Sequence, residues 1–417
     1  MAVDTPAKIA VLGAGPIGLE TALYARSLGY DVDVFERGRV AENILRWGHV
    51  RMFSPFEMNR STLGLAALAA QDETYNPPSD IDLLTGREWV ERYLIPLSST
   101  DLISDCIREN TQIVSVGRAG RLKTEFLGSD SRTESSFRIL TRNAAGQEQR
   151  TEADVVIDTT GVFGNANRLG RGGIPAVGEQ RLRERIEFGL PDILGCDRER
   201  YAERRTLVVG SGYSAATNVV SLAKLASESA ATSVVWITRR ERECPIERIP
   251  NDRLEQRDKL AQDANRLVAS NESPVTHYSA TVVEDLNFAD GKFKVKFAGQ
   301  LSDTLEFDQI IANVGYRPDH TIYEELHIHL CYASGGPMKL AAALLGQNSP
   351  DCLDQTSCGP QTLINPEPNF YILGAKSYGR NSNFLVSVGL QQIREVFTII
   401  GGREELDLYA SVEHLLA

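Results

Sequence analysis

The stretch from Lys8 to Glu36 reads KIAVLGAGPIGLETALYARSLGYDVDVFE, and it decides the fold of the first part of the chain. Its apolar run, Ile9 to Leu12, is typical of a strand buried in a parallel sheet. A glycine-rich turn follows, and a helical pattern then continues to Gly29. A second strand, Val32 to Phe35, ends at an acidic residue. This succession predicts a strand–turn–helix–strand unit.

The turn GAGPIG has the residues that a dinucleotide needs at this place. The first glycine allows the tight turn, the second lets the backbone approach the pyrophosphate, and the third lets helix and strand pack closely. The helix N-terminus directs N–H groups at the phosphates, and the acid accepts ribose hydroxyls. The alternative is a turn without a ligand. The predicted contacts are Gly13, Gly15, Pro16, Ile17, Gly18 and Glu36.

A second turn of this kind, GSGYSA, follows the strand Thr206–Val209. The next strand, Ser233 to Thr238, ends in two arginines and no acid. Guanidinium groups bind a 2′-phosphate bidentately, so this site is predicted to prefer NADPH to NADH. The alternative is that the two arginines are only solvated side chains at the end of the strand. The predicted contacts are Gly210, Gly212, Tyr213, Ser214, Ala215, Arg239 and Arg240.

Two such turns in one chain fit two different nucleotides. The acid after the first suits the free ribose of FAD, and the bases after the second suit the phosphorylated ribose of NADPH. We therefore predict an α/β protein of two doubly wound Rossmann-like domains, with facing clefts that let a hydride pass from NADPH to FAD.

Composition narrows the class of protein. The 417 residues are 42% hydrophobic and 24% charged, which is ordinary for a globular chain of two to three domains. A net charge of −12 without a basic block argues against a nucleic-acid partner, and no apolar stretch is long enough to span a membrane. Scattered cysteines and the lack of a signal peptide predict a soluble cytoplasmic protein.

Three further stretches resemble the two-dinucleotide-binding-domain flavoproteins, which include thioredoxin reductases, flavin-containing monooxygenases and N-hydroxylating monooxygenases. Residues 154–161 are similar to the turn where the chain leaves the FAD domain. Residues 310–318 are similar to the turn where it returns, and residues 369–375 to the last FAD-domain strand. The resemblance implies an FAD domain at 1–200 and 322–417 around an NADPH domain at 201–321. Its implied cofactor contacts are Val114, Gly161, Gly315, Gly374 and Ala375. At the position of Ala375 the family often has Asp.

The next acceptor of the electrons separates the branches of this family. Disulfide reduction needs a closely spaced cysteine pair near the flavin, because a thiolate must attack within bonding reach. Cys352 and Cys358 are separated by five residues, so we interpret them as two reduced loop cysteines. A mobile relay is the alternative.

The segment Arg46–Pro55, RWGHVRMFSP, favours monooxygenation. Its place resembles the flavin-facing segment of the monooxygenases, where a dry cationic wall shields the reduced cofactor from water. Candidate catalytic residues are Arg46, Trp47, His49 and, by resemblance to flavin-containing monooxygenases, Asn165. The alternative is that the aromatic residues are core and the arginines are solvated. The histidine of that family's signature is absent after Phe163.

The sequence thus predicts an oxidoreductase that oxygenates a small nitrogen- or sulfur-containing substrate with molecular oxygen. An NADPH-dependent reductase that passes electrons to a quinone or a partner protein is the alternative, and a non-catalytic flavin-binding sensor is a weaker one. No metal site is predicted, because alternate residues such as His327, His329 and Cys331 lie too far apart on a strand to share one ion. A homodimer is left open.

Overall fold

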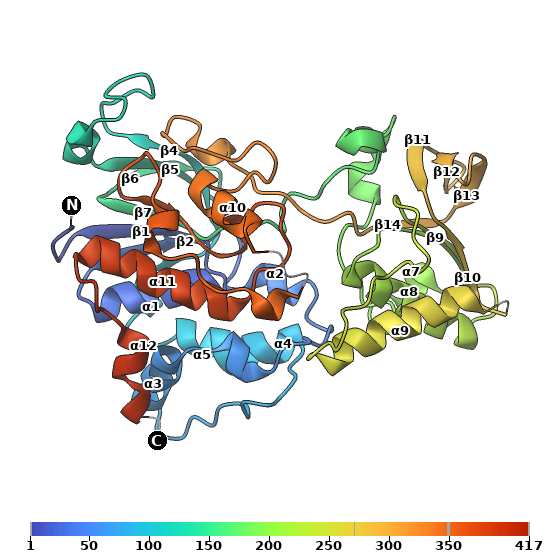
Figure 1. Ribbon diagram of the computed structural model, residues 1–417, viewed down its shortest axis with the longest axis horizontal. Helices are drawn as coiled ribbons and strands as arrows, with labels where there is room; N and C mark the ends of the chain where they lie inside the picture. Colours follow the sequence, from blue (N-terminus) through green and yellow to red (C-terminus); the bar gives the residue numbers. More distant parts are fainter. Residues whose placement is uncertain (1, 271, 348–350, 416–417) are drawn as a thin grey trace. The chain divides into compact units, whose positions relative to one another are not determined.

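A computed structural model describes residues 2–270, 272–347 and 351–415. Contacts within the chain divide it into two compact units (Figure 1). The first unit consists of Met1–Leu45, Ser54–Asn165 and Arg317–Ala417, and the second of Arg46–Phe53 and Ala166–Tyr316. None of the helices in the described ranges combines the length and apolar character needed to cross a bilayer.

The first unit is built on a parallel sheet of five strands in the order β15-β7-β1-β2-β3. Its central strand β1 is buried along almost its whole length, because side chains on both of its faces are covered. The strands are β1 (Lys8–Leu12), β2 (Asp31–Phe35), β3 (Ile107–Arg108), β7 (Val155–Asp158) and β15 (Phe370–Ile372).

Two long helices, α1 (Pro16–Ser27) and α11 (Val386–Gly401), lie side by side against one face of this sheet (Figure 1). The other face packs on an antiparallel sheet of β4 (Thr111–Arg118), β5 (Phe137–Asn143) and β6 (Glu148–Ala153). Around them lie shorter helices: α2 (Glu42–Leu45), α3 (Thr62–Gln71), α4 (Gly86–Trp89), α5 (Ile95–Ser98), α10 (Met338–Leu345) and α12 (Leu408–Ser411).

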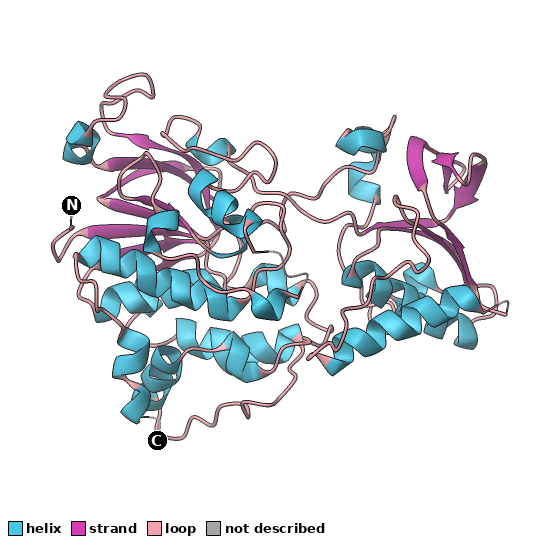
Figure 2. Ribbon diagram, in the orientation of Figure 1, coloured by secondary structure: helices cyan, strands magenta, loops and turns pink. Residues whose placement is uncertain are grey.

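The second unit repeats this plan with a four-stranded parallel sheet in the order β10-β9-β8-β14. Helices lie against one face and an antiparallel sheet against the other (Figure 2). The parallel strands are β8 (Arg205–Val209), β9 (Ser233–Ile237), β10 (Val275–Tyr278) and β14 (Gln309–Ala312). These helices are α7 (Arg198–Tyr201), α8 (Tyr213–Glu228) and α9 (Glu255–Ala269), and the antiparallel strands are β11 (Thr281–Ala289), β12 (Lys292–Gly299) and β13 (Thr304–Phe307). The short helix α6 (Glu179–Leu182) packs on β11, on the side of the antiparallel sheet.

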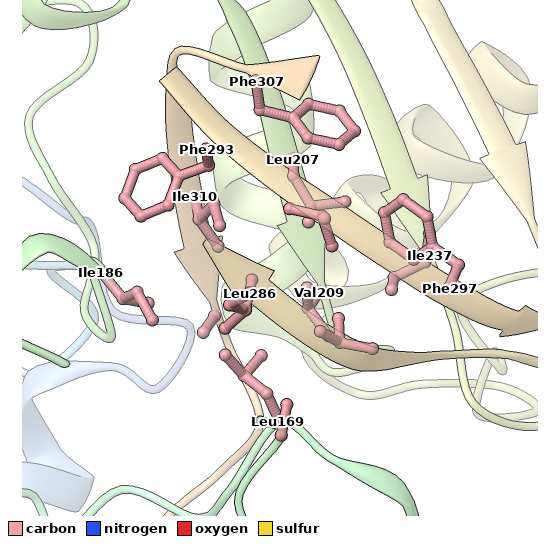
Figure 3. Packing of buried hydrophobic residues seen from close by; sticks show 14 of the residues in the cluster. Leu169, Ile186, Leu207, Val209, Ile237, Leu286, Phe293, Phe297, Phe307 and Ile310 are labelled. Atoms are coloured by element: carbon pink, nitrogen blue, oxygen red, sulfur yellow. The ribbon is translucent and has the colours of Figure 1, made fainter. Parts of the chain in front are cut away.

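The core between the two sheets of the second unit explains why β12 alternates in burial. Phe293 and Phe297 point inward from β12, and Phe307 joins them from β13 (Figure 3). They pack on Leu207 and Ile310 of the parallel sheet. The intervening lysines of β12 face outward, which is the period-two pattern of a sheet with one wet face.

The predicted α/β class with two Rossmann-like domains is confirmed, with one difference. The long helices of each unit cover one face of its parallel sheet, and the alternating strands of an antiparallel sheet cover the other. The compact units divide the chain at 45/46, 53/54, 165/166 and 316/317, which differs from the domain borders at 200/201 and 321/322 that stay a prediction from the sequence. The difference arises because Leu169, Leu182 and Ile186 contribute to the core of the second unit.

Candidate functional site

The three glycines of the first turn differ in their backbone conformation and in what a side chain at each position would meet. Gly13 has a φ of +99°, and a Cβ on Gly18 would overlap the carbonyl oxygen of Gly13. Gly15 differs, because its φ is −78° and a Cβ placed on it would meet no protein atom within 4 Å. Packing within the protein therefore does not require glycine at position 15. A phosphate that lies on the backbone does require it.

The start of α1 supplies the donors for such a phosphate. Pro16 is the first helical residue, and Gly15 before it has no side chain to cap the helix. The first N–H groups of a helix have no partner inside the helix, and they carry the positive end of its dipole. The N–H groups at the start of this helix can therefore bind an anion.

Glu36 lies at the carboxyl end of β2, beside this turn. Its carboxylate accepts hydrogen bonds from the N–H groups of Ala14 and Gly38, both at 2.9 Å. These two bonds fix the carboxylate against the turn and leave further lone pairs on its oxygens to accept hydroxyl groups. Val114 lies at a register shift between β4 and β5, and it has no opposite residue in the ladder. Its backbone groups can therefore bind a ligand instead.

The second turn shows the same division of roles. Gly210 has a φ of +136°, and a Cβ on it would overlap the carbonyl oxygen of Asn313. Gly212 has a φ of −100°, and a Cβ on it would meet no protein atom within 4 Å. Helix α8 then starts at Tyr213, and the third position of the motif, Ala215, is fully buried. This turn is a second cradle whose middle glycine the protein's own packing does not require.

Side chains that the sequence analysis missed hold this second turn. The indole N–H of Trp236 donates to the carbonyl oxygen of Gly210 at 2.7 Å. The amide of Asn313 bonds to Asn218 and to the carbonyl oxygen of Gly189. Trp236 lies near the end of β9, and Asn313 directly follows β14. Both are distant from the turn in sequence, so no local pattern predicts their role. They position the backbone and do not themselves form the cradle.

Arg239 and Arg240 follow β9 after one intervening residue, and both are exposed. The residue before them, Thr238, is fixed by a 3.0 Å hydrogen bond to the ring of His277 and by its N–H bond to Tyr278. Burial lowers the pKa of His277 to about 4, so the ring is neutral at neutral pH. The two guanidinium groups therefore extend from a fixed strand end next to the second turn.

The two connections between the units are hydrogen-bonded to each other. The N–H of Asn167 donates to Gly315, and the N–H of Arg317 donates to Asn165. The side chain of Asn165 donates to the carbonyl oxygen of Pro318 at 3.3 Å. Gly161, where the first connection starts, has a φ of +67°. The structure thus places the predicted catalytic residue Asn165 in the crossing between the units.

The last predicted FAD motif lies after β15. The N–H of Gly374 donates to the buried side chain of Gln392, and its φ is +72°. Its Cα faces the side chain of Ile17, which a Cβ would approach to 3.3 Å. Ala375 is half-buried and offers no carboxylate, and the following residue is a buried lysine, Lys376. The first turn and this motif therefore pack together through Ile17.

The candidate catalytic segment belongs to the second unit by its contacts. Phe53 packs edge-on against Tyr213 at the start of α8, with ring centres 5.8 Å apart. Arg46 and His49 are exposed. Trp47 is half-buried, but its indole nitrogen is buried and has no hydrogen-bond partner in the described part of the chain. An acceptor from a ligand would satisfy this donor.

The structure also describes the residues considered above for disulfide and metal chemistry. All six cysteines are free. Over residues 2–270, 272–347 and 351–415, no three histidine, cysteine, aspartate or glutamate side chains gather as ion ligands would. At His327, His329 and Cys331 no metal site is predicted. The ring of His327 there donates a hydrogen bond to the carbonyl oxygen of Lys123.

Residues 8–43 match the protein family described as pyridine nucleotide-disulphide oxidoreductase. No curated protein matches the sequence. Solved structures do match its fold. The bacillithiol disulfide reductase of Bacillus cereus is 16% identical, with a TM-score of 0.67 and coverage of 95% of this chain and 99% of that one.

A monooxygenase and an N-hydroxylase are also similar in fold. The cadaverine monooxygenase of desferrioxamine biosynthesis from Erwinia amylovora, bound to FAD, is 14% identical with a TM-score of 0.64. The match covers 96% of each chain. The ornithine N-hydroxylase of Kutzneria sp. 744, with reduced FAD and NADP⁺, is 14% identical with a TM-score of 0.61, covering 96% of this chain and all of that one.

By the family match at residues 8–43 and by the folds of these solved structures, the chain is similar to the two-dinucleotide-binding-domain flavoproteins, a class of oxidoreductases. This confirms the resemblance drawn from the sequence. The likeness spans reductases and monooxygenases alike, and at these identities it is a likeness of fold.

Proposed function

We propose that the protein is an FAD-dependent enzyme that oxidises NADPH. The observation that carries this proposal is the pair of open glycines, Gly15 and Gly212. Each has a backbone conformation open to any residue and free space where a side chain would lie, so a phosphate can approach the backbone closely at both positions. Each also precedes the N-terminus of a long helix, where phosphates bind.

The residues that would hold the two cofactors follow from this geometry. The turn Gly13–Gly18 would bind the FAD pyrophosphate, Glu36 the ribose hydroxyls, and Val114 the base through its backbone. The turn Gly210–Ala215 would bind the NADPH pyrophosphate, and Arg239 and Arg240 its 2′-phosphate. Bound FAD supplies the capacity to take a hydride from NADPH and pass the electrons on.

Within this class we propose a single-component monooxygenase that acts on a small nitrogen- or sulfur-containing substrate. Support comes from the segment Arg46–Phe53, which packs on the start of α8 through Phe53 and has a buried, unpaired indole donor at Trp47. Arg46 directly precedes Trp47 in the sequence, and His49 follows it by two residues. Such a segment would exclude water from the reacting groups.

An NADPH-dependent reductase is the second candidate, and the likeness to the bacillithiol disulfide reductase favours it. The free cysteines show no disulfide that could relay electrons inside this chain. A reductase of this kind would therefore pass electrons from the flavin directly to an external disulfide, a quinone or a partner protein.

The first experiment tests the cofactors. The purified protein should be yellow or take up added FAD, and anaerobic NADPH should bleach the flavin absorbance. A colourless protein that neither binds FAD nor transfers electrons from NADPH would overturn the whole proposal.

The second experiment separates the two candidates. The NADPH-reduced protein is mixed with oxygen in a stopped-flow spectrometer. A band that differs from oxidised and reduced flavin and persists for seconds supports oxygenation. Return of the oxidised spectrum in a single step, together with NADPH oxidation stimulated by a quinone or a small disulfide, supports the reductase.

A further inference from the structure

A buried ion pair lies at the carboxyl end of the first parallel sheet. The ammonium group of Lys376 lies 2.6 Å from a carboxylate oxygen of Asp158, and the two side chains are 1% and 0% exposed. Removing two charges from water is costly, and apolar residues in their place often give equal or greater stability. A role in stability alone is therefore a weak explanation for this pair.

The pair fixes the turn where the chain leaves the first sheet. Asp158 is the last residue of β7, and its carboxylate accepts hydrogen bonds from the N–H and hydroxyl groups of Thr160 at 2.9 and 2.7 Å. Lys376 follows β15 and donates to the same hydroxyl group at 3.0 Å. One ion pair thus joins the ends of two adjacent strands and sets the conformation of the exit turn.

The exit turn in turn touches the first glycine turn. The hydroxyl group of Thr159 donates to the carbonyl oxygens of Leu12 and Gly13 at 2.8 and 3.1 Å. A Cβ on Gly13 would lie 3.2 Å from the Cα of Thr160. On the other side, Gly374 lies against Ile17. The two segments that the ion pair joins therefore flank the cradle of the first dinucleotide turn.

The segment that returns from the second unit closes the cluster. The Tyr323 ring is 2% exposed, and its centre lies 5.0 Å from the Lys376 ammonium group. Its hydroxyl group is 2.5 Å from Nδ1 of His320, whose Nε2 donates to the carbonyl oxygen of Gly335 at 2.6 Å. The ion pair is thereby enclosed from three parts of the chain.

We propose that Asp158 and Lys376 are positioning residues for FAD: their ion pair holds the exit turn and the turn after β15 at the spacing that the first glycine turn needs to bind the cofactor. This inference rests on the proposed binding of FAD at Gly13–Gly18. It assigns a function to Lys376. This residue follows Ala375, the position at which the family that the sequence resembles often has Asp.

The test compares FAD affinity with the stability of the apoprotein. The variants are Asp158→Asn, Lys376→Met and the double variant Asp158→Asn/Lys376→Met. Each single variant leaves one buried charge unpaired and should lower both the melting temperature and the FAD affinity. The double variant removes both charges, so its melting temperature should return towards that of the unsubstituted protein while its FAD dissociation constant stays roughly tenfold raised.

Glu367→Gln is the matched control, because Glu367 forms equally buried ion pairs with Arg118 and Arg132 in the same unit. These pairs hold the end of β4 and the loop that contains Arg132, not the exit turn, and the substitution should affect the melting temperature but not the FAD dissociation constant. If the double variant binds FAD as tightly as the unsubstituted protein, or if the control weakens FAD binding equally at equal melting temperature, the inference is overturned. An unsubstituted protein that binds no FAD would instead overturn the proposed function on which it rests.

Discussion

The two glycine turns have the same backbone arrangement, and they differ in the residues beside it. In both, the first glycine has a positive φ and the second faces open space. The third position differs, because a Cβ on Gly18 would overlap the protein backbone whereas Ala215 is accommodated. The strand after the first turn ends in Glu36, and the strand after the second ends in Arg239 and Arg240. The comparison indicates a division of roles in the proposed function: the cradle would bind pyrophosphate in general, and the strand end would select the nucleotide.

The largest expected effect concerns this selection. Replacing Arg239 and Arg240 together by Ala should raise the dissociation constant of NADPH roughly 10- to 100-fold, because two charge-assisted contacts to the 2′-phosphate are lost. The dissociation constant of NADH should change little, and titration calorimetry measures both. Equal weakening of the two nucleotides would show that the arginines do not read the phosphate.

A substitution at the third position tests the closeness of helix and strand. Gly18→Ala should destabilise the first unit by about 2 kcal/mol, since the new methyl group overlaps the carbonyl oxygen of Gly13. The matched substitution Ala215→Gly should cost about 1 kcal/mol or less, which is the ordinary helix penalty of glycine. Chemical denaturation of both variants measures the difference. Similar losses at the two positions would contradict the different packing of the two turns.

The helices behind the two turns also differ, in their response to pH. Burial raises the pKa of Glu20 in α1 to about 7, although Tyr93 and Ser61 donate hydrogen bonds to it. The buried residues of α8 include no ionisable side chain. Because the folded pKa of Glu20 is higher than the unfolded value, its contribution is fully present below about pH 4.5 and decreases as the pH rises to about 7.

Glu20→Gln should remove this pH dependence and stabilise the protein at pH 8 by about 2 kcal/mol. The free energy of unfolding, measured between pH 4.5 and pH 8 for both proteins, checks the prediction. Parallel curves for the variant and the unsubstituted protein would show that Glu20 does not titrate in this range.

The smallest expected effect concerns the support of the second turn. Trp236→Phe removes the 2.7 Å hydrogen bond to Gly210 and should cost about 1 kcal/mol of NADPH binding, a roughly fivefold rise in KM. The FAD content should not change, because the first unit has its own cradle. An unchanged KM would show that the turn keeps its conformation without the indole.

Local patterns allowed much of this molecule to be predicted from its sequence. The two turns, the strands beside them, and the acidic and basic strand ends each lie within some 40 residues of chain, and local periodicity encodes them. The antiparallel sheets were not foreseen, because an alternating strand shows that one face is covered without showing what covers it. The contact of Phe53 with Tyr213 was equally hidden, since 160 residues separate the two.

By itself, the sequence determined the two glycine turns and their acidic and basic strand ends, and it predicted which ribose each turn suits, since these features depend on residues that are neighbours along the chain. Only the tertiary structure decided which distant side chains hold the cradles: Trp236 against Gly210, and Lys376 against Asp158. The physical reason is that a hydrogen bond or an ion pair depends on distance in space, and the path of the whole chain sets that distance.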